Sequence, residues 1–170
     1  MKRVIIICIM FLILLPVIQT KAKTKRPEPT FEETVETMVR EHKIMLDRLI
    51  AAWEHRQEEI NLLAEVIYHE NWHTDKDHLA AYYTGAVVMN RVNSKAWPNS
   101  VKEVLYQRGQ YSTTKLFYTV DLPDECYEMA RDIYRNGTPE VPANVIFQSM
   151  QKGLGRGHWK VINGEYFAYG

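Results

Sequence analysis

The sequence predicts an α+β fold that is mainly helical, with a small antiparallel β-sheet at its C-terminal end and an amphipathic helix before the domain. Three observations support this prediction. Apolar residues recur at helical spacing in several segments between residues 30 and 136. Capping residues mark where most of these helices begin, and strand-like segments with a hairpin signal follow after residue 145. The apolar fraction is 46% of 170 residues, which is enough for a folded core and excludes a disordered chain.

The first helix is predicted to begin at Thr30, which forms a capping box with Glu33. An apolar stripe follows with alternating steps of four and three residues, formed by Phe31, Val35, Met38, His42, Met45, Leu49 and Ala52. We interpret it as a helix packed on its own domain, because the stripe covers only about three heptads and contains a histidine. A short helical stalk with weak self-association is the alternative.

Helix is expected to continue, or to restart, from about Glu58 to Trp72, with an apolar face made by residues 62, 63, 66 and 67. The polar segment 73–77 should break it. Asp77 is then expected to cap a second helix that runs to about Asn93.

Two shorter helices follow. Ser100 and Glu103 form a second capping box, which predicts a helix through Tyr106. Pro123 is expected to open another helix, which should stop at residues 136–137, an Asn-Gly pair.

The end of the chain changes character. Residues 145–150 and 158–162 resemble strands on either side of a glycine-rich loop, 153–157. Residues 163–164 are Asn-Gly, a strong two-residue hairpin signal before a last strand at 165–169. The glycine-rich loop is not followed by a helix, so we interpret it as a mobile flap beside a cleft and not as a phosphate-binding loop.

The N-terminus has the pattern of a secretory signal peptide. Lys2 and Arg3 precede an uncharged run at 4–18, and 20–22 offers a small-x-small cleavage site. We therefore expect an exported protein; an uncleaved membrane anchor is the alternative.

The predicted organisation has four parts: a signal peptide at 1–22, a linker at 23–29, an amphipathic helical extension at 30–57 and a catalytic domain at 58–170. The formal net charge of the chain is zero, so no excess of positive charge points to nucleic acid. Of two cysteines, Cys8 lies in the signal, and Cys126 is expected to be a buried, small apolar residue without a disulfide partner.

Glu70 is the strongest candidate for a catalytic group. It lies at the predicted end of an apolar helix, just before a polar break, and has aromatic neighbours in Tyr68 and Trp72. We expect the apolar turn and the helix C-terminus to raise the pKa of this carboxyl, which is what a general acid needs near neutral pH.

The same residues also match HExxH, a zinc metallopeptidase motif, as the segment 69–73 reads HENWH. A zinc site of this type needs a third ligand. The helix is expected to break at His73, and the spacing that could supply a third histidine holds Leu79 instead; only His78 or Glu103 could be proposed. We therefore predict no metal and no cofactor, and keep a zinc metallopeptidase as an alternative function.

The order of several segments resembles the cell wall hydrolase family, which includes the SleB-type spore cortex-lytic enzymes of germination. An apolar helix ends in Tyr-x-Glu, a helix ends in Met-Asn-Arg, a Trp-Pro-Asn turn precedes an apolar helix, a Gln-aromatic motif follows, and strands close the domain. These segments are residues 63–70, 86–92, 97–105, 109–112, 145–147 and 166–168. The resemblance spans roughly Leu62 to Tyr169, nearly all of the predicted domain.

The resemblance implies a lysozyme-like fold and cleavage of peptidoglycan glycan strands by a muramidase or a lytic transglycosylase. It also implies that the exported protein acts in the cell wall or the extracellular space. A hydrolase of this kind needs a second carboxylate across the scissile bond. Asp75, Asp77 and Glu65 are the nearest candidates, and none has a convincing place opposite Glu70. We therefore favour a lytic transglycosylase, in which Glu70 alone serves and the C6 hydroxyl of muramic acid closes a 1,6-anhydro ring.

Further residues are predicted to bind the sugar. Gln110 offers both a donor and an acceptor, and Tyr111 offers an aromatic face, although core packing is an equal interpretation for Tyr111. Tyr68, Trp72 and Phe147 complete the predicted substrate-binding set. The remaining alternative function is a non-catalytic module that binds the cell wall.

Overall fold

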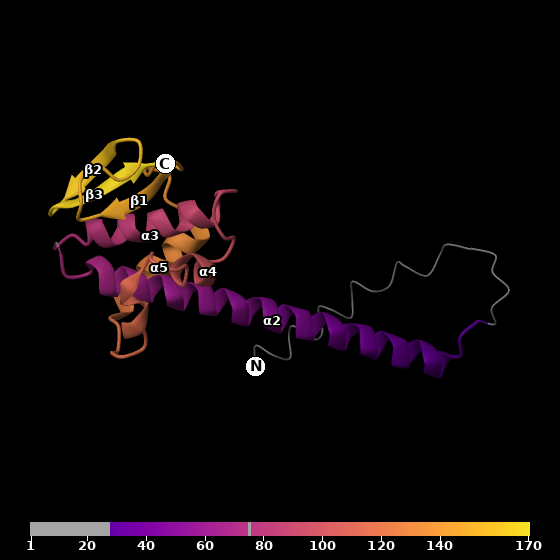
Figure 1. Cartoon of the computed structure of the whole chain (residues 1–170). Coiled ribbons are helices and arrows are strands. Elements are labelled where there is room, and N and C mark those ends of the chain that lie inside the picture. The colour runs from indigo at the N-terminus through magenta and orange to yellow at the C-terminus, as the bar shows by residue number, and fades with distance from the viewer. Residues whose placement is uncertain (1–27, 75) are drawn as a thin grey trace. The chain divides into compact units, whose positions relative to one another are not determined.

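The computed structural model describes residues 28–74 and 76–170 of the chain, so the predicted signal peptide lies outside the described residues. The helices are α2 (Phe31–Asn71), α3 (Leu79–Val92), α4 (Val101–Leu105), α5 (Asp124–Asn136) and a 3-10 helix, η1 (Ser112–Leu116). The strands are β1 (Val145–Ser149), β2 (His158–Ile162) and β3 (Glu165–Tyr169) (Figure 1). The predicted class, mainly helical α+β with a small C-terminal antiparallel sheet, is confirmed.

Contacts between residues divide the chain into two compact units, with the boundary between Met45 and Leu46. The core and the pocket described below lie in the second unit. Within the described ranges, no helix is long and apolar enough to cross a membrane.

Helix α2 begins with the predicted capping box. The Thr30 amide donates to Glu33 Oε2 at 2.8 Å, and the Glu33 amide donates back to Thr30 Oγ1 at 3.3 Å. The helix then runs unbroken to Asn71. Its apolar stripe is exposed at every position except His42, which is half-buried. Burial on α2 starts at Glu59. The packing of the stripe on the domain stays a prediction.

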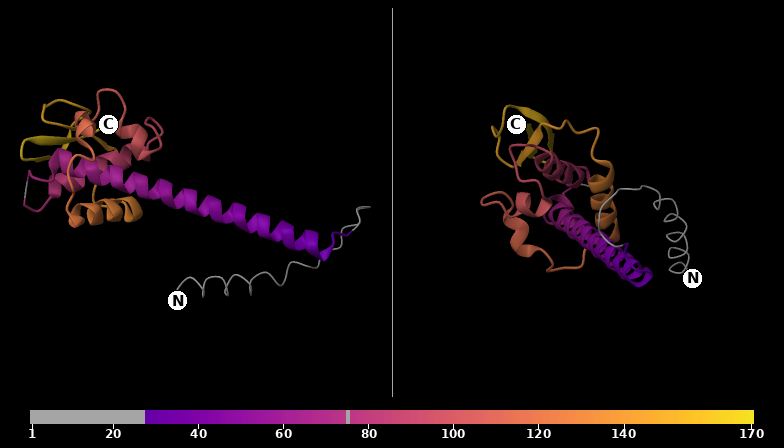
Figure 2. Two further views of the ribbon diagram at one scale, coloured as in Figure 1. Left: turned by 90° about the horizontal axis from the view of Figure 1, so that it is seen from below. Right: turned by 90° about the vertical axis from the view of Figure 1, so that its right-hand side faces the viewer.

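Helix α3 lies at the centre of the second unit because two of its faces are buried. Ala81 and Val88 join the core formed with the last turns of α2 and with α5. Ala86 and Val87 face the sheet instead and pack in a cluster that includes Phe167 of β3. The two further views in Figure 2 show the same core of helices with the sheet at one end of the unit.

A glycine allows the close approach of three helices in this core. A Cβ atom at Gly85 of α3 would lie 2.7 Å from Ile133 Cδ1 of α5 and 3.0 Å from Ile67 Cδ1 of α2. A contact of 2.7 Å is shorter than real Cβ contacts, so a larger residue at this position would require the ends of the Ile133 and Ile67 side chains to move. The close packing lies one turn before the end of α2, where Glu70 lies.

The predicted cap of α3 is wrong. The N-cap residue is His78 and not Asp77; it adopts φ 51° and makes no side-chain cap hydrogen bond. The ring of His78 is held in another way, since its Nδ1 lies 2.7 Å from the Trp72 carbonyl oxygen and the ring stacks on Trp72 at 3.8 Å. These two contacts join the ends of the loop between α2 and α3.

The shorter helices follow the predicted signals. Ser100 Oγ accepts from the Glu103 amide at 3.2 Å, and α5 runs from Pro123 as its N-cap to Gly137 as its C-cap. The buried carboxylate of Glu59 also accepts from the Val101 amide at 2.7 Å, which ties the start of α4 to α2.

Cys126 of α5 is fully buried, and its thiol donates to the Ala64 carbonyl oxygen at 3.3 Å. Burial raises the pKa of this thiol to about 12, so it stays protonated, as expected for a packing residue.

The sheet has the order β1-β3-β2, with both pairs antiparallel. The predicted hairpin connects β2 and β3: Asn163 and Gly164 both adopt positive φ, 50° and 87°, as a type I′ turn requires. The glycine-rich loop is tied to the end of β3, because Arg156 donates its amide to the Tyr169 carbonyl and Gly157 accepts from the Tyr169 amide, each at 2.9 Å. No observation tests the predicted mobility of this loop.

Candidate functional site

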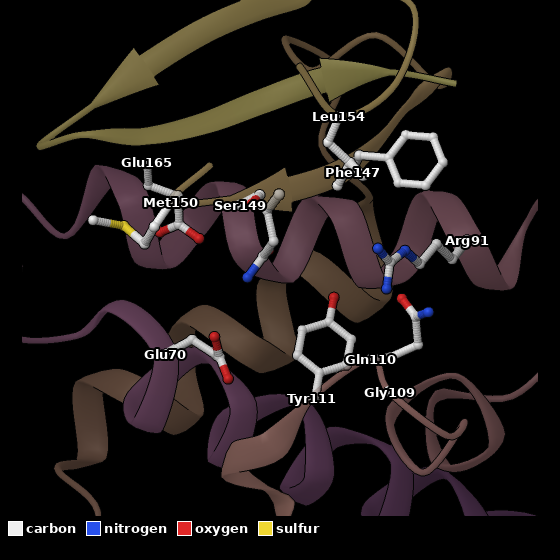
Figure 3. Close-up of a pocket in the computed structure, with 11 residues that line it drawn as sticks. Glu70, Arg91, Gly109, Gln110, Tyr111, Phe147, Ser149, Met150, Leu154 and Glu165 are labelled. Carbon is white, nitrogen blue, oxygen red and sulfur yellow. The ribbon is translucent and has the colours of Figure 1, made fainter. Parts of the chain in front are cut away.

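A pocket with a cavity volume of about 380 Å³ lies between the end of α2, the loop before η1 and the sheet. That volume suits a small ligand or one part of a polymer. Its lining combines carboxylates, amides and aromatic rings (Figure 3) and is formed by Glu70, Arg91, Gly109, Gln110, Tyr111, Phe147, Gln148, Ser149, Met150, Leu154 and Glu165.

Glu70 enters this pocket from the last turn of α2 and is half-buried. Its Oε1 accepts a short hydrogen bond from the hydroxyl of Thr113 in η1. A helix end and a hydroxyl from another element therefore hold the carboxyl in place. The sequence did not identify Thr113, because its contact with Glu70 joins positions 43 residues apart.

Gln110, Tyr111 and Phe147, three of the predicted substrate-binding residues, line the same pocket. Tyr111 is only 6% exposed, and its hydroxyl is one of the buried polar atoms that have no hydrogen-bond partner in the described structure. Burial raises the pKa of Tyr111 to about 12, with the charge of Arg91 acting in the opposite direction, so the phenol stays protonated near neutral pH. It can donate one hydrogen bond to a ligand.

Arg91 connects the aromatic wall of the pocket to the sheet. Its guanidinium carbon lies 4.3 Å from the ring centroid of Trp97 and 5.4 Å from that of Tyr111. Its Nε donates to the Ile146 carbonyl oxygen of β1 at 2.7 Å. Asn90 beside it donates to the carbonyls of Pro142 and Val145, each at 3.0 Å, which ties α3 to the start of β1.

Glu165 is a carboxylate of the pocket that sequence reasoning did not propose. It follows the Asn-Gly turn as the first residue of β3 and is 8% exposed. Burial raises the pKa of this carboxyl, hydrogen bonding by Asn71 opposes that rise, and the negative charge of Glu70 adds to it. A signal was present: side chains alternate along a strand, so Glu165 shares the inner face of β3 with the buried Phe167.

The other two predicted substrate-binding residues do not line the pocket. Trp72 is 6% exposed and stacks on His78, which favours a structural role in the loop after α2. Tyr68 is partly buried against the core, and its ring meets His69 and His73 edge-on at centroid distances of 5.2 and 5.0 Å.

The three carboxylates considered as partners of Glu70 lie elsewhere or outside the described residues. Glu65 is 1% exposed, and its Oε2 lies 3.3 Å from Nε2 of His69, one turn away on α2. Asp77 is exposed and is not among the residues that line the pocket. Asp75 falls outside the described residues.

The HENWH segment does not form the arrangement of a zincin helix. Helix α2 ends at Asn71, so His73 lies in the turn after it, while His69 stacks on Phe117 at a centroid distance of 5.9 Å. Across residues 28–74 and 76–170, no three His, Cys, Asp or Glu side chains come together in a group that could hold a metal ion.

Comparison with known proteins gives one match. A sequence model of the Cell Wall Hydrolase family matches residues 75–160, which is half of the chain. No curated protein and no solved structure matches, so the lysozyme-like part of the fold prediction stays a prediction. The matched segment contains Gln110, Tyr111 and Phe147 of the pocket wall, whereas Glu70 precedes it and Glu165 follows it. On this match the chain belongs to the Cell Wall Hydrolase family.

Proposed function

We propose that this protein cleaves the glycan strands of peptidoglycan, with Glu70 as the general acid that protonates the glycosidic oxygen. Membership of the Cell Wall Hydrolase family supports peptidoglycan as the substrate and action in the cell wall or outside the cell. The single observation that carries the assignment of the acid is the position of Glu70 in the pocket, held by the Thr113 hydroxyl and lying beside polar and aromatic side chains.

The chemistry of the pocket wall suits a sugar. Tyr111 and Phe147 offer aromatic faces, which pack against the apolar face of a pyranose ring. Gln148 Oε1 is buried without a hydrogen-bond partner in the described structure and can accept from a substrate hydroxyl or acetamido group, and the protonated Tyr111 hydroxyl can donate. Gln110 is exposed at the pocket edge and adds an amide.

The Glu70→Gln variant tests the acid. An amide cannot donate the proton, so cleavage of purified sacculi should fall by about a hundredfold or more while the fold is retained. Glu128→Gln, an exposed carboxylate of α5 that does not line the pocket, is the matched control and should cleave normally. Undiminished cleavage by Glu70→Gln in a folded protein would show that Glu70 is not the acid.

The two alternative functions are outcomes of the same experiment. A zinc metallopeptidase would cleave stem peptides, lose activity with chelators and lose it again in His73→Ala. A wall-binding module would bind sacculi and release nothing from them. We expect glycan cleavage that survives both chelation and His73→Ala.

The type of product is a separate question. The prediction of a lytic transglycosylase depended on the lack of a second carboxylate near Glu70. Glu165 lines the same pocket, so a second carboxylate does lie there. The lytic transglycosylase remains our proposal, which 1,6-anhydro ends on the released fragments would support and reducing muramic ends alone would contradict. The bond that is cleaved and the acid that cleaves it are unaffected.

A further inference from the structure

Glu165 lies in the same pocket as the proposed acid, although it comes from a distant part of the chain. Glu70 is at the end of α2, and Glu165 is the first residue of β3. The two carboxyls are close enough for the charge of Glu70 to raise the pKa of Glu165. Figure 3 shows both on the same side of the pocket, with the Tyr111 ring beside them. A sugar held for proton transfer from Glu70 would therefore also meet Glu165.

Polar contacts hold the carboxyl of Glu165 in this place. Asn163, in the hairpin turn before Glu165, donates its side-chain amide to the Thr74 carbonyl oxygen at 2.8 Å, which joins the turn to the loop after α2. Asn71 of α2 hydrogen-bonds the Glu165 carboxyl and donates to Thr84 Oγ1 at 2.8 Å. The hydrogen bond from Asn71 lowers the pKa of Glu165, so Asn71 is the donor and the Glu165 oxygen that faces it is an acceptor.

The surroundings of Glu165 favour its uncharged form. The residue is 8% exposed, and burial is the largest cause of its raised pKa. The ion pairs found within residues 28–74 and 76–170 do not include Glu165, so none of them offsets the cost of burying its charge. An anionic Glu70, as formed when it gives up its proton, opposes ionisation of Glu165 further. A protonated carboxyl here accepts from Asn71 through one oxygen and keeps one hydroxyl as a donor.

We propose that Glu165 is a substrate-binding residue whose carboxylic acid donates a hydrogen bond to the acetamido carbonyl oxygen of the sugar bound beside Glu70. The inference rests on the proposed cleavage of glycan strands. Glu70 acts on the oxygen attached to C1, and the acetamido group of a peptidoglycan sugar is on the neighbouring carbon, C2. A group beside Glu70 is therefore well placed to meet it. A carbonyl oxygen only accepts hydrogen bonds, so a neutral acid suits it and a carboxylate does not.

This contact makes the pocket selective for N-acetylated sugars. A sugar with a plain hydroxyl at C2 has no carbonyl oxygen at that position, so the buried donor of Glu165 loses its acceptor. Leaving a buried polar group unpaired costs free energy, which is how a polar site rejects an analogue that lacks the matching group. Glu165 thus acts in recognition and takes no proton in the reaction.

Soluble sugars test the inference without relying on cleavage. Triacetylchitotriose carries acetamido groups at C2, whereas cellotriose has the same linkage and backbone with hydroxyl groups in their place, and both are uncharged. Isothermal titration calorimetry of the full chain should show that it binds triacetylchitotriose about tenfold more tightly than cellotriose, the effect of one well-placed hydrogen bond. Equal affinity for the two sugars, or no binding of triacetylchitotriose, would overturn recognition of the acetamido group.

Variants assign this preference to Glu165. Glu165→Met removes the polar group, so it should bind triacetylchitotriose about tenfold more weakly and cellotriose unchanged. In Glu165→Gln the amide oxygen can face Asn71 while the amide nitrogen donates to the sugar, so the preference should be kept. Glu128→Gln, at an exposed position of α5, is the control and should bind as the wild type does. Circular dichroism of each variant shows whether the fold is retained.

The outcomes separate this proposal from the proposed function. Loss of the preference in a folded Glu165→Gln would mean that Glu165 does not act as a donor. Full preference in a folded Glu165→Met would place the recognition on another residue. If the acetamido preference depends on Glu165 but the wild type releases no glycan fragments from purified sacculi, the sugar recognition stands and the proposed function is wrong. If Glu70→Gln loses cleavage but no variant at Glu165 changes the preference, only the role of Glu165 is wrong.

Discussion

The pocket has a helix wall, at the end of α2, and a sheet wall, at the start of β3, and each carries a carboxyl in different surroundings. Glu70 is half-buried on a helix end and accepts from a hydroxyl, whereas Glu165 is buried at the start of a strand beside an amide. The helix wall gives its carboxyl access to solvent and to a substrate. The sheet wall keeps its carboxyl away from water, so that the charge of Glu165 is costly to hold. The two carboxyls of one pocket therefore differ in how strongly their surroundings oppose a negative charge.

The largest expected effect is the loss of the carboxyl on the helix wall. Glu70→Gln removes the proton that the proposed reaction gives to the leaving sugar, so the rate of cleavage should fall by about a hundredfold or more. The rates of Glu70→Gln and Glu165→Gln on sacculi, each compared with the wild type, measure the difference between the walls. A larger loss in Glu165→Gln than in Glu70→Gln would place the acid on the sheet wall instead.

A smaller effect is expected from the support of Glu70. Thr113→Val removes the hydroxyl that donates to Glu70 Oε1, which should lower kcat by about tenfold, since a hydrogen bond to a charged group contributes about 1.5–3 kcal/mol. Thr113→Ser keeps the hydroxyl and should keep most of the activity. Ser112→Ala, at the exposed neighbour, is the control. Equal kcat values for Thr113→Val and Ser112→Ala would show that this contact does not position the acid.

The buried carboxyl of Glu165 should make the stability of the fold depend on pH. Burial raises the pKa of Glu165 above its ordinary value of 4.5, so folding favours the protonated carboxyl. At pH well below 4.5 the carboxyl is protonated in both the folded and the unfolded protein, and stability is complete. As pH rises through the folded-state pKa, this stability is lost, because the folded protein must then bury a charge.

The amide of Glu165→Gln cannot ionise, so this variant should not lose stability as pH rises. Its Tm should therefore exceed that of the wild type by a few degrees near neutral pH, and the gap should shrink in acid. Thermal unfolding of both proteins at several pH values measures the difference. A gap that is the same at every pH would mean that the charge of Glu165 is not what destabilises the fold.

The smallest effect on cleavage is expected from the exposed part of α2. We propose that the extension serves reach or weak self-association and does not build the pocket, since no residue before Glu70 lines it. A protein lacking residues 1–45 should cleave sacculi at close to the rate of the full chain. Sedimentation of both proteins reports self-association. Loss of cleavage in the shortened protein, once shown to be folded, would mean that the extension contributes to the site.

Local signals predicted most of the fold correctly, because each depends on residues close in sequence. The Thr30 capping box, the Pro123 helix start and the Asn163-Gly164 hairpin are of this kind. The cap of α3 was predicted wrongly because His78 is held by Trp72, six residues away, instead of by its own helix. The partner of the stripe on α2 could not be predicted either, since helical periodicity does not identify the surface against which a stripe packs.

In the candidate site too, residues with a local signal were predicted and a residue placed by a long-range contact was not. The sequence pointed to Glu70 from its helix-end position and to Gln110, Tyr111 and Phe147 through family resemblance, and the structure brings these four to one pocket. Glu165 was missed because its approach to Glu70 depends on how the hairpin folds back onto the end of α2. The search for a second carboxylate stayed near Glu70 in sequence, whereas antiparallel strands bring distant residues together.

The most direct test of the central claim is the composition of the fragments that the wild-type protein releases from purified sacculi. Mass spectrometry distinguishes new ends in the glycan from new ends in the stem peptides. The account predicts fragments with intact stem peptides and new glycan ends, formed by the wild type and by Glu128→Gln but not by Glu70→Gln. Intact glycan strands with cleaved stem peptides, or glycan ends formed equally well by Glu70→Gln, would contradict it.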